Sequence, residues 1–294
     1  MISYILRAHI ALIIVNIIYG VNYTIAKDLT PEFIGPFGFV LMRITGMVIL
    51  IWTLGLFYPE KVDKKDFKIL FFCAMTGVVI NQGLFFLGLS LTSPINASII
   101  MIVNPILVVI FAAWILGEKI TKWKISGILL GLIGAIILIT FKKMGDAQGN
   151  IWGDICIFLN ALSYAIFLVL VKPLMQKYNA ITVMKWVFLM GLPFMIPFGW
   201  NEFTDVNWNL FTPSMIWAVI FVIVGTTFLA YLLNTYALKR ISPSVVSAYI
   251  YLQPVIATFM AISAGKDSLT LIKWLAAILI FSGVWMVSRR RNFE

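Results

Sequence analysis

Long apolar runs, separated by short polar connections, dominate the chain. A membrane-spanning helix needs about 20 mainly apolar residues, each adding 1.5 Å. The alternation of apolar and polar residues that is typical of strands is absent, and open strands cannot satisfy their backbone groups in lipid. The pattern therefore predicts ten spanning helices, at about residues 8–26, 34–57, 67–91, 94–116, 122–141, 151–171, 180–199, 213–237, 243–264 and 270–288.

Composition supports an all-α polytopic membrane protein. Apolar residues make up 62% of the chain and charged residues 12%, whereas soluble domains carry about 25% charged residues. The net charge of +10 would suggest nucleic acid in a soluble protein. Here the basic residues lie between apolar runs, where they act as topology signals and contact lipid headgroups. We therefore expect membrane lipid, and no nucleic acid, as a partner.

The distribution of Lys and Arg predicts the orientation. Basic residues gather in the connections on the side of the amino terminus, for example at Lys64, Lys65 and Lys119. The positive-inside rule then places both termini in the cytoplasm. The first apolar run has a basic residue, Arg7, but no small-residue cleavage site follows it, so we interpret it as a helix rather than a signal peptide.

The inventory of reactive residues argues against catalysis. The chain has one histidine, His9, and two cysteines, Cys73 and Cys156, both inside apolar segments. These residues cannot form a disulfide framework or a zinc ligand set. The motifs of a phosphate-binding loop and of a zinc metalloprotease are also missing. We expect no catalytic residues, no metal and no cofactor.

Self-comparison reveals an internal repeat. At one constant offset, without a gap, Asn104-Pro105 meets Gln253-Pro254, Thr121 meets Thr270, and Gly134 meets Gly283. The predicted repeats are residues 1–145 and 146–294, each with five spans. Since five is odd, the second repeat must cross the membrane in the opposite direction. Inverted repeats are typical of secondary transporters, whose substrate site lies near the midplane between them.

One stretch resembles the signature of EamA-type members of the drug/metabolite transporter superfamily. It runs from Asn104-Pro105-Ile106 to Leu116-Gly117-Glu118-Lys119-Ile120-Thr121 and continues with Gly127 and Gly134. Arg43 resembles an arginine that this family often carries in its second span. The second copy has Asp267 where the family usually has Glu. The resemblance implies a metabolite transporter, because relatives are associated with export of amino acids, nucleosides and other metabolites.

Two prolines predict helix breaks at the midplane. Pro105 and Pro254 each lie about 16 Å along their helix. Proline removes one backbone hydrogen bond, which here frees the carbonyls of Met101 and Ile250. Asn104 and Gln253 place an amide beside each break. The feature fits the wall of a substrate cavity, or a packing kink with an interhelical hydrogen bond.

Uncharged polar side chains gather at a similar depth, and facing lipid would be costly for them. We expect them to line a cavity in the bundle, where they contact either substrate or one another. They are Asn16, Tyr19 and Asn22 on one face of the first span, Gln82 beside Asn81 in the third, Asn160 and Tyr164 in the sixth, and Tyr231 and Asn234 in the eighth.

Charged residues within or at the ends of the spans are few. Arg43 lies inside the second span, where an ionisable residue indicates function by default, or else a structural arginine that snorkels or caps carbonyls. Glu118 and Asp267 lie at segment ends, and we interpret both as structural. The face of Gly127, Gly131 and Gly134 suits packing within the bundle or a dimer seam, so a monomer and a homodimer both remain open.

Together these features predict a secondary transporter of a small molecule such as an amino acid, working by alternating access in the bacterial inner (plasma) membrane. Since every Asp and Glu lies at a segment end or in a loop, we expect an exporter or facilitator. The alternatives are an integral membrane enzyme acting on lipid, which one histidine makes hard to assemble, and a channel or scaffold that does not transport.

Overall fold

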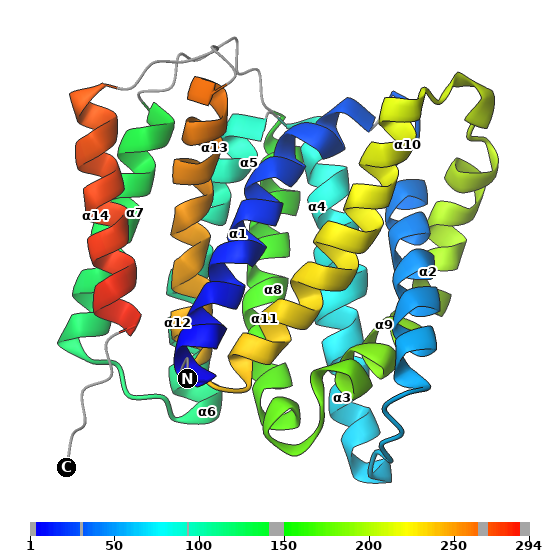
Figure 1. Ribbon diagram of the computed structural model, residues 1–294, viewed down its shortest axis with the longest axis horizontal. Coiled ribbons are helices and arrows are strands. Elements are labelled where there is room, and N and C mark those ends of the chain that lie inside the picture. The colour runs from blue at the N-terminus through cyan, green and yellow to red at the C-terminus, as the bar shows by residue number, and fades with distance from the viewer. Residues whose placement is uncertain (1–3, 30–31, 93, 141–149, 264–269, 289–294) are drawn as a thin grey trace.

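The described residues form one bundle of helices and include no strand (Figure 1). The computed structural model describes residues 4–29, 32–92, 94–140, 150–263 and 270–288, apart from some side chains within them. Its elements are α1 (Tyr4–Leu29), α2 (Pro36–Gly55), η1 (Lys64–Asp66), α3 (Phe67–Ala74), η2 (Met75–Val79), α4 (Ile80–Leu91), α5 (Pro94–Met101), α6 (Asn104–Leu116), α7 (Lys122–Thr140), α8 (Ile151–Lys177), α9 (Ala180–Thr204), η3 (Trp208–Leu210), α10 (Pro213–Ile220), η4 (Phe221–Leu229), α11 (Ala230–Leu238), α12 (Pro243–Ala248), η5 (Tyr249–Tyr251), α13 (Leu252–Ser263) and α14 (Leu271–Ser288).

Within the described residues, eight helical segments are long and apolar enough to cross a membrane. This establishes a polytopic membrane protein. The two further spans predicted from the sequence correspond to α7 and to α12–α13, which run beside the other helices in Figure 1. The count of ten spans and the cytoplasmic termini stay predictions.

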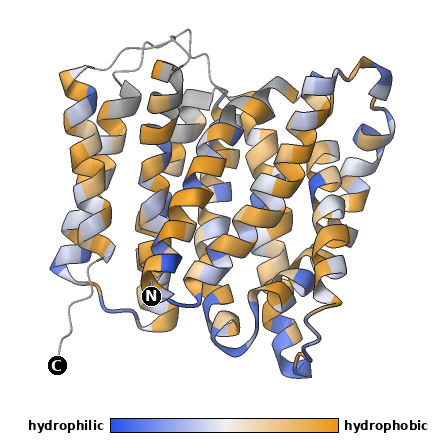
Figure 2. Cartoon of the chain, in the orientation of Figure 1, coloured by the Kyte–Doolittle hydropathy of each residue, from blue (hydrophilic) through white to orange (hydrophobic). Residues whose placement is uncertain are grey.

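The helices turn apolar side chains outward and polar ones inward. On α1, Ile13 and Ile17 are 44% and 46% exposed, whereas Asn16 between them is 3% exposed. Figure 2 shows apolar residues along the middle of the helices and hydrophilic ones in many of the connections. This inverts the soluble pattern, as a lipid environment requires.

Two helices are interrupted next to the predicted prolines. α5 ends at Met101 and α6 begins at Asn104, one residue before Pro105. In the second broken helix, which packs against the first through α12 and α6, α12 gives way to the 3-10 turn η5, and α13 begins two residues before Pro254. Backbone at both places leaves the regular α-helical ladder, because proline lacks the N–H that the ladder needs.

Two π-helical segments, which the sequence analysis does not foresee, interrupt two other spans. η2 separates α3 from α4, and the nine-residue η4 separates α10 from α11. In a π turn the backbone hydrogen bond spans five residues instead of four, so the segment departs from regular α geometry. Both segments adjoin the pocket described below.

A carboxylate ties the start of α2 to the end of α9. The N-cap of α2 is Gly35, which has no side chain to accept a bond from the helix. Instead Glu202 accepts a hydrogen bond from the backbone N–H of Gly38 at 2.7 Å. A carboxylate at this position accepts a hydrogen bond from a free backbone N–H, and its negative charge interacts favourably with the positive end of the helix dipole.

Small residues allow α7 and α14 to pack backbone against backbone. A Cβ atom added at Gly127 would lie 2.7 Å from the carbonyl oxygen of Gly283, and one at Gly134 would lie 2.7 Å from that of Ala276. The small-residue face of α7 thus packs against α14 of the same chain, as the alternative of packing within the bundle predicted.

Candidate functional site

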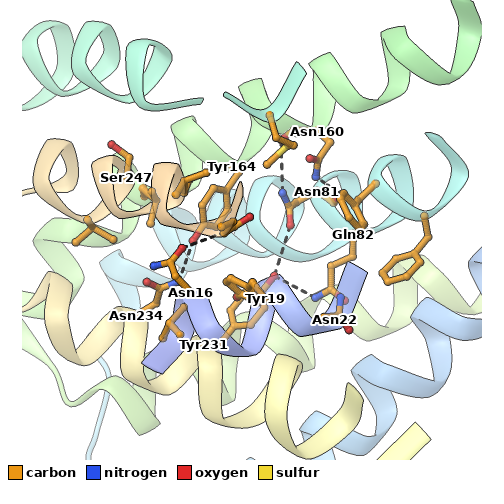
Figure 3. A pocket seen from close by; sticks show the side chains of 18 of the residues that line it. Asn16, Tyr19, Asn22, Asn81, Gln82, Asn160, Tyr164, Tyr231, Asn234 and Ser247 are labelled. Carbon is orange, nitrogen blue, oxygen red and sulfur yellow. Dashed lines mark hydrogen bonds between the residues drawn. The ribbon is translucent and has the colours of Figure 1, made fainter. Parts of the chain in front are cut away.

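A pocket lies at the centre of the bundle, where α1, α2, α4, α8 and α11 meet the two broken helices (Figure 3). Its lining residues come from both predicted repeats. They are Val15, Asn16, Tyr19, Asn22, Arg43, Asn81, Gln82, Phe85, Phe86, Met101, Asn160, Tyr164, Leu168, Tyr231, Asn234, Val246, Ser247, Ile250 and Gln253.

The structure brings together nearly all of the side chains that the sequence singles out. The predicted residues that line the pocket are Asn16, Tyr19, Asn22, Arg43, Gln82, Asn160, Tyr164, Tyr231, Asn234 and Gln253. Asn104 is the exception. It is fully buried outside the lining, and its side-chain nitrogen donates to the carbonyl oxygen of Ala161 on α8 at 2.7 Å.

The amide beside the second break is held by α1. Gln253 donates from Nε2 to Oδ1 of Asn16 at 3.1 Å, and Asn16 donates from Nδ2 to the carbonyl oxygen of Leu12 at 2.7 Å. This chain of hydrogen bonds fixes both amides along one wall of the pocket. It also joins the first helix to the last broken one.

Tyr231 connects the two π-helical spans. Its hydroxyl donates to the carbonyl oxygen of Gly77 in η2 at 3.0 Å and accepts from Nε2 of Gln82 at 3.2 Å. Asn234, one turn further along α11, donates to the hydroxyl of Tyr164 at 3.0 Å. The phenols and amides of the lining are therefore hydrogen-bonded in groups that join different helices.

Two asparagines clasp α4 to α8. The side chain of Asn160 donates to the backbone carbonyl of Asn81 at 2.6 Å, and that of Asn81 donates to the carbonyl of Asn160 at 3.5 Å. Asn81 is thus a lining residue that the sequence analysis noted beside Gln82 but did not select. The reciprocal contact shows that part of this polar set binds the bundle together.

Arg43 lies in the pocket wall and is 5% exposed. Its Nε donates to Oγ1 of Thr227 in η4 at 2.9 Å, and its guanidinium carbon lies 4.8 Å from the ring centre of Phe86. The side chain neither reaches the membrane surface nor caps a helix carbonyl within the described residues. Of the readings open for Arg43, the snorkelling one does not fit this position.

The sequence analysis did not identify the apolar residues of the pocket lining. Phe85, Phe86 and Leu168 are pocket residues, but in a chain this apolar nothing distinguishes them from residues in lipid. Met101 and Ile250 carried a signal, because they are the residues whose carbonyls the prolines free. Both line the pocket.

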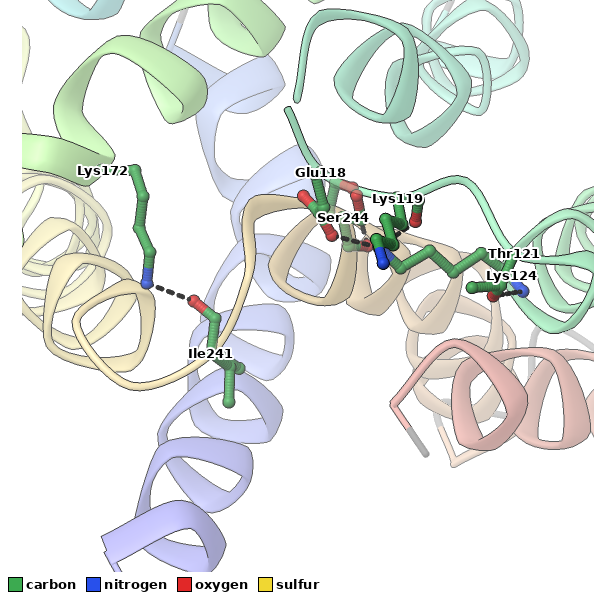
Figure 4. A network of polar contacts seen from close by, with 8 residues as sticks. Glu118, Lys119, Thr121, Lys124, Lys172, Ile241 and Ser244 are labelled. Carbon is green, nitrogen blue, oxygen red and sulfur yellow. Dashed lines mark hydrogen bonds and ion pairs between the residues drawn. The ribbon is translucent and has the colours of Figure 1, made fainter. Parts of the chain in front are cut away.

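A second polar cluster lies away from the pocket, around the connection after α6 (Figure 4). Glu118 forms an ion pair with Lys124, as expected for a carboxylate with a structural role. Lys172 on α8 donates to the carbonyl oxygen of Ile241 at 2.9 Å and to that of Leu238. Asp267, which corresponds to Glu118 in the second repeat of the sequence, lies outside the described residues.

Possible metal ligands are not clustered in the described part of the chain. No group of three or more His, Cys, Asp or Glu side chains there could hold a metal ion. What the pocket offers instead is amide, phenol and guanidinium groups beside aromatic rings. Such a lining can bind a small polar molecule reversibly and carries no acid–base pair or nucleophile.

Comparison with known proteins identifies the family. The profile of the EamA-like transporter family matches residues 6–140 and again residues 151–289. The chain belongs to the EamA-like transporter family. This confirms the resemblance of the motif around Glu118.

Full-length relatives agree with this membership. An uncharacterized transporter of Archaeoglobus fulgidus is 23% identical, over 97% of this chain and 99% of its own. The uncharacterized transporter YyaM of Bacillus subtilis is 26% identical, over 96% and 94%. A solved structure titled only as the crystal structure of a protein shares the fold, with a TM-score of 0.75 at 18% identity over 97% of this chain and 96% of that one.

These findings establish the general class of the protein. It is a multi-pass membrane transporter, because its family and its relatives are named as transporters and its described helices include eight membrane-length segments. It is not an enzyme. Membership also makes a small molecule the expected cargo and lipid the surrounding partner.

Proposed function

We propose that the chain is a secondary transporter that carries a small polar metabolite, such as an amino acid, through the central pocket by alternating access. The observation that carries this proposal is the position of the pocket. It lies between two broken helices, one from each predicted repeat, and is lined by side chains of both. Secondary transporters with inverted repeats bind substrate at this place.

Two observations support the repeat itself. The family profile matches the chain twice, once in each predicted half. In addition, Gln82 and Tyr231 are 149 residues apart. Pro105 and Pro254 have the same spacing, so Gln82 and Tyr231 are equivalent positions of the two repeats. Nε2 of Gln82 lies 3.2 Å from the hydroxyl of Tyr231. Residues that are equivalent under a two-fold axis meet each other only close to that axis. Their contact therefore supports an axis that passes through the pocket.

The remaining features of the proposal follow from the sequence. These features are ten spans and cytoplasmic termini in a bacterial inner membrane. α7 and α12–α13 supply the two spans beyond the eight membrane-length segments. Coupling to protons usually requires a carboxylate deep in a span. The described pocket lining contains none, which favours an exporter or facilitator driven by the substrate gradient. A channel is disfavoured because the lining has no ring of charges or carbonyl filter.

Counterflow in proteoliposomes tests the proposal. Purified protein is reconstituted into liposomes loaded with unlabelled aromatic, branched or hydroxyl amino acids, or with nucleosides, and uptake of the labelled compound is followed. One class should accumulate above empty liposomes. Tyr164→Phe and Gln253→Ala should each lower that uptake about tenfold, the effect of losing one hydrogen bond of about 1.4 kcal/mol.

Tyr58→Phe provides the matched control, because Tyr58 is 47% exposed and lies outside the pocket. Its uptake should equal that of the unmodified protein. Accumulation that survives both pocket substitutions would place the substrate elsewhere and contradict the proposal.

A further inference from the structure

The guanidinium of Arg43 is buried in the pocket wall with most of its donors unused. Within the described part of the chain its one hydrogen bond runs from Nε to Thr227, at 2.9 Å. An arginine carries five N–H donors and stays protonated in proteins. The donors on its two terminal nitrogens are therefore available at the pocket.

No described carboxylate neutralises this charge. The ion pairs among the described residues join Lys124 to Glu118, and Lys177 to Asp63 and Asp66. None of them includes Arg43. A buried charge is costly unless it is paired and hydrogen-bonded. The ring of Phe86 offers a partial, non-ionic partner at 4.8 Å. A molecule entering the pocket with an anionic group would supply what the protein lacks.

Unused acceptors lie in the same pocket. The side-chain oxygens of Asn22, Gln82 and Asn160 are buried and have no hydrogen-bond partner. For Gln82 and Asn160 the orientation of the amide is set by its nitrogen, which donates to Tyr231 and to the carbonyl of Asn81 respectively. Their oxygens are thus held as acceptors. Buried acceptors of this kind match a group rich in N–H donors, such as an ammonium.

We propose that Arg43 is the counter-ion of a carboxylate on the substrate, and that these free amide oxygens accept the N–H donors of a primary ammonium on the same molecule. The inference rests on the proposed function and narrows the cargo to a zwitterion. A neutral metabolite would leave Arg43 unpaired. A phosphate ester would pair with Arg43 but bring no ammonium donors to the amide oxygens.

A ligand series on the purified, unmodified protein tests both contacts. Thermal stabilisation is titrated with phenylalanine and leucine, with their decarboxylated amines phenethylamine and isopentylamine, and with the deaminated acids 3-phenylpropionate and 4-methylpentanoate. At least one amino acid should bind. Removal of either charged group should weaken its binding about 10- to 100-fold, since each removes hydrogen bonds to a charged group.

Variants of Arg43 assign the carboxylate contact. In Arg43→Gln the amino acid should bind as weakly as its amine, because the guanidinium that pairs with the carboxylate of the amino acid is gone. Arg43→Lys keeps a charge but not the forked donor, and should recover part of the difference. Arg7→Gln is the matched control, since Arg7 is exposed and outside the pocket. If Arg43→Gln does not fold, the ligand series and Arg43→Lys still decide.

Three outcomes would overturn the inference. They are equal binding of an amino acid and its amine, equal stabilisation by chloride or phosphate alone, and no binding of any carboxylate in the series. Counterflow of a nucleoside without carboxylate binding would refute the inference and leave the proposed transport intact. Binding that depends on Arg43, without accumulation in proteoliposomes, would support the inference and refute the transport.

Discussion

Two polar side chains in the pocket, Gln82 and Asn160, each tie helices together and also carry an oxygen without a hydrogen-bond partner. Asn160 shows this division within one amide, because its nitrogen holds α4 while its oxygen has no partner. A substitution at such a residue therefore removes a structural bond and a potential ligand contact at once. Separating the two effects requires residues whose contacts are only structural or can be measured in pairs.

The clasp between Asn81 and Asn160 can be measured in this way. Each of Asn81→Ala and Asn160→Ala should lower the free energy of unfolding by about 1 kcal/mol, the size of a hydrogen bond between membrane helices. The double variant should lose about the sum, since each side chain donates to a backbone carbonyl that alanine keeps. Unfolding in SDS measures the cycle. Asn209→Ala, in an exposed position, should have no effect, and unchanged stability of both single variants would show that the two hydrogen bonds do not stabilise the fold.

Residue chemistry also decided how much of the site was predictable. Amides, phenols and an arginine are expensive in lipid, so their presence in apolar runs indicates an interior position. Ten of the candidate residues do line the pocket. Asn104 obeys the same rule, yet its buried amide is directed at α8. Burial could be inferred from the sequence, whereas the choice between a neighbouring helix and a cavity depends on rotation of the helix.

At the scale of elements, the pocket is framed by places where helices depart from α geometry. The proline breaks were visible in the sequence because proline lacks an N–H. The π-helical segments η2 and η4 were not. They contain no proline, and their sequences resemble ordinary apolar helix. Their geometry depends on tertiary contacts, such as the hydrogen bond from Tyr231 to the carbonyl of Gly77, which no local pattern reveals.

Gly77 offers a test of that dependence. An added Cβ atom would lie 2.3 Å from the ring of Phe167. Although alanine favours a helix over glycine by about 1 kcal/mol, Gly77→Ala should lower stability by about 1–3 kcal/mol through overpacking. Gly83→Ala in α4 is the matched control, because its Cβ meets Phe37 no closer than 3.5 Å. Thermal unfolding in detergent should rank Gly83→Ala above Gly77→Ala, and the reverse order would refute this account of η2.

The pair α7 and α14 should affect stability without affecting substrate binding. A Cβ atom at Gly134 would lie 2.7 Å from the carbonyl oxygen of Ala276, and neither helix contributes to the pocket lining. Gly134→Ala should therefore lower the unfolding temperature, with a loss of about 1–3 kcal/mol. Ligand affinity of the folded fraction should stay unchanged. A change of affinity in titrations of that fraction would show that the pair reaches the pocket.

At the scale of the whole molecule, the two predicted repeats pack into each other rather than side by side. α2 of the first packs against α9 of the second, where a Cβ atom at Gly199 would lie 2.5 Å from the carbonyl oxygen of Phe37. α4 of the first packs against α8 of the second through Gly88 and Gly153. The fold class follows from the sequence, but this interleaving does not, because the apolar runs carry no sign of which partner each helix faces.

The interleaving of α2 with α9 and of α4 with α8 has a consequence for how the chain can be divided. Halves that bury such close contacts in each other are poor independent proteins. Either half alone would leave glycine grooves facing lipid, and the first would also leave the Asn81 amide without Asn160. Expressed as two separate polypeptides, 1–145 and 146–294, each should be degraded by itself and accumulate only when both are made in the same cell. Pulse-chase labelling of the fragments, singly and together, measures this.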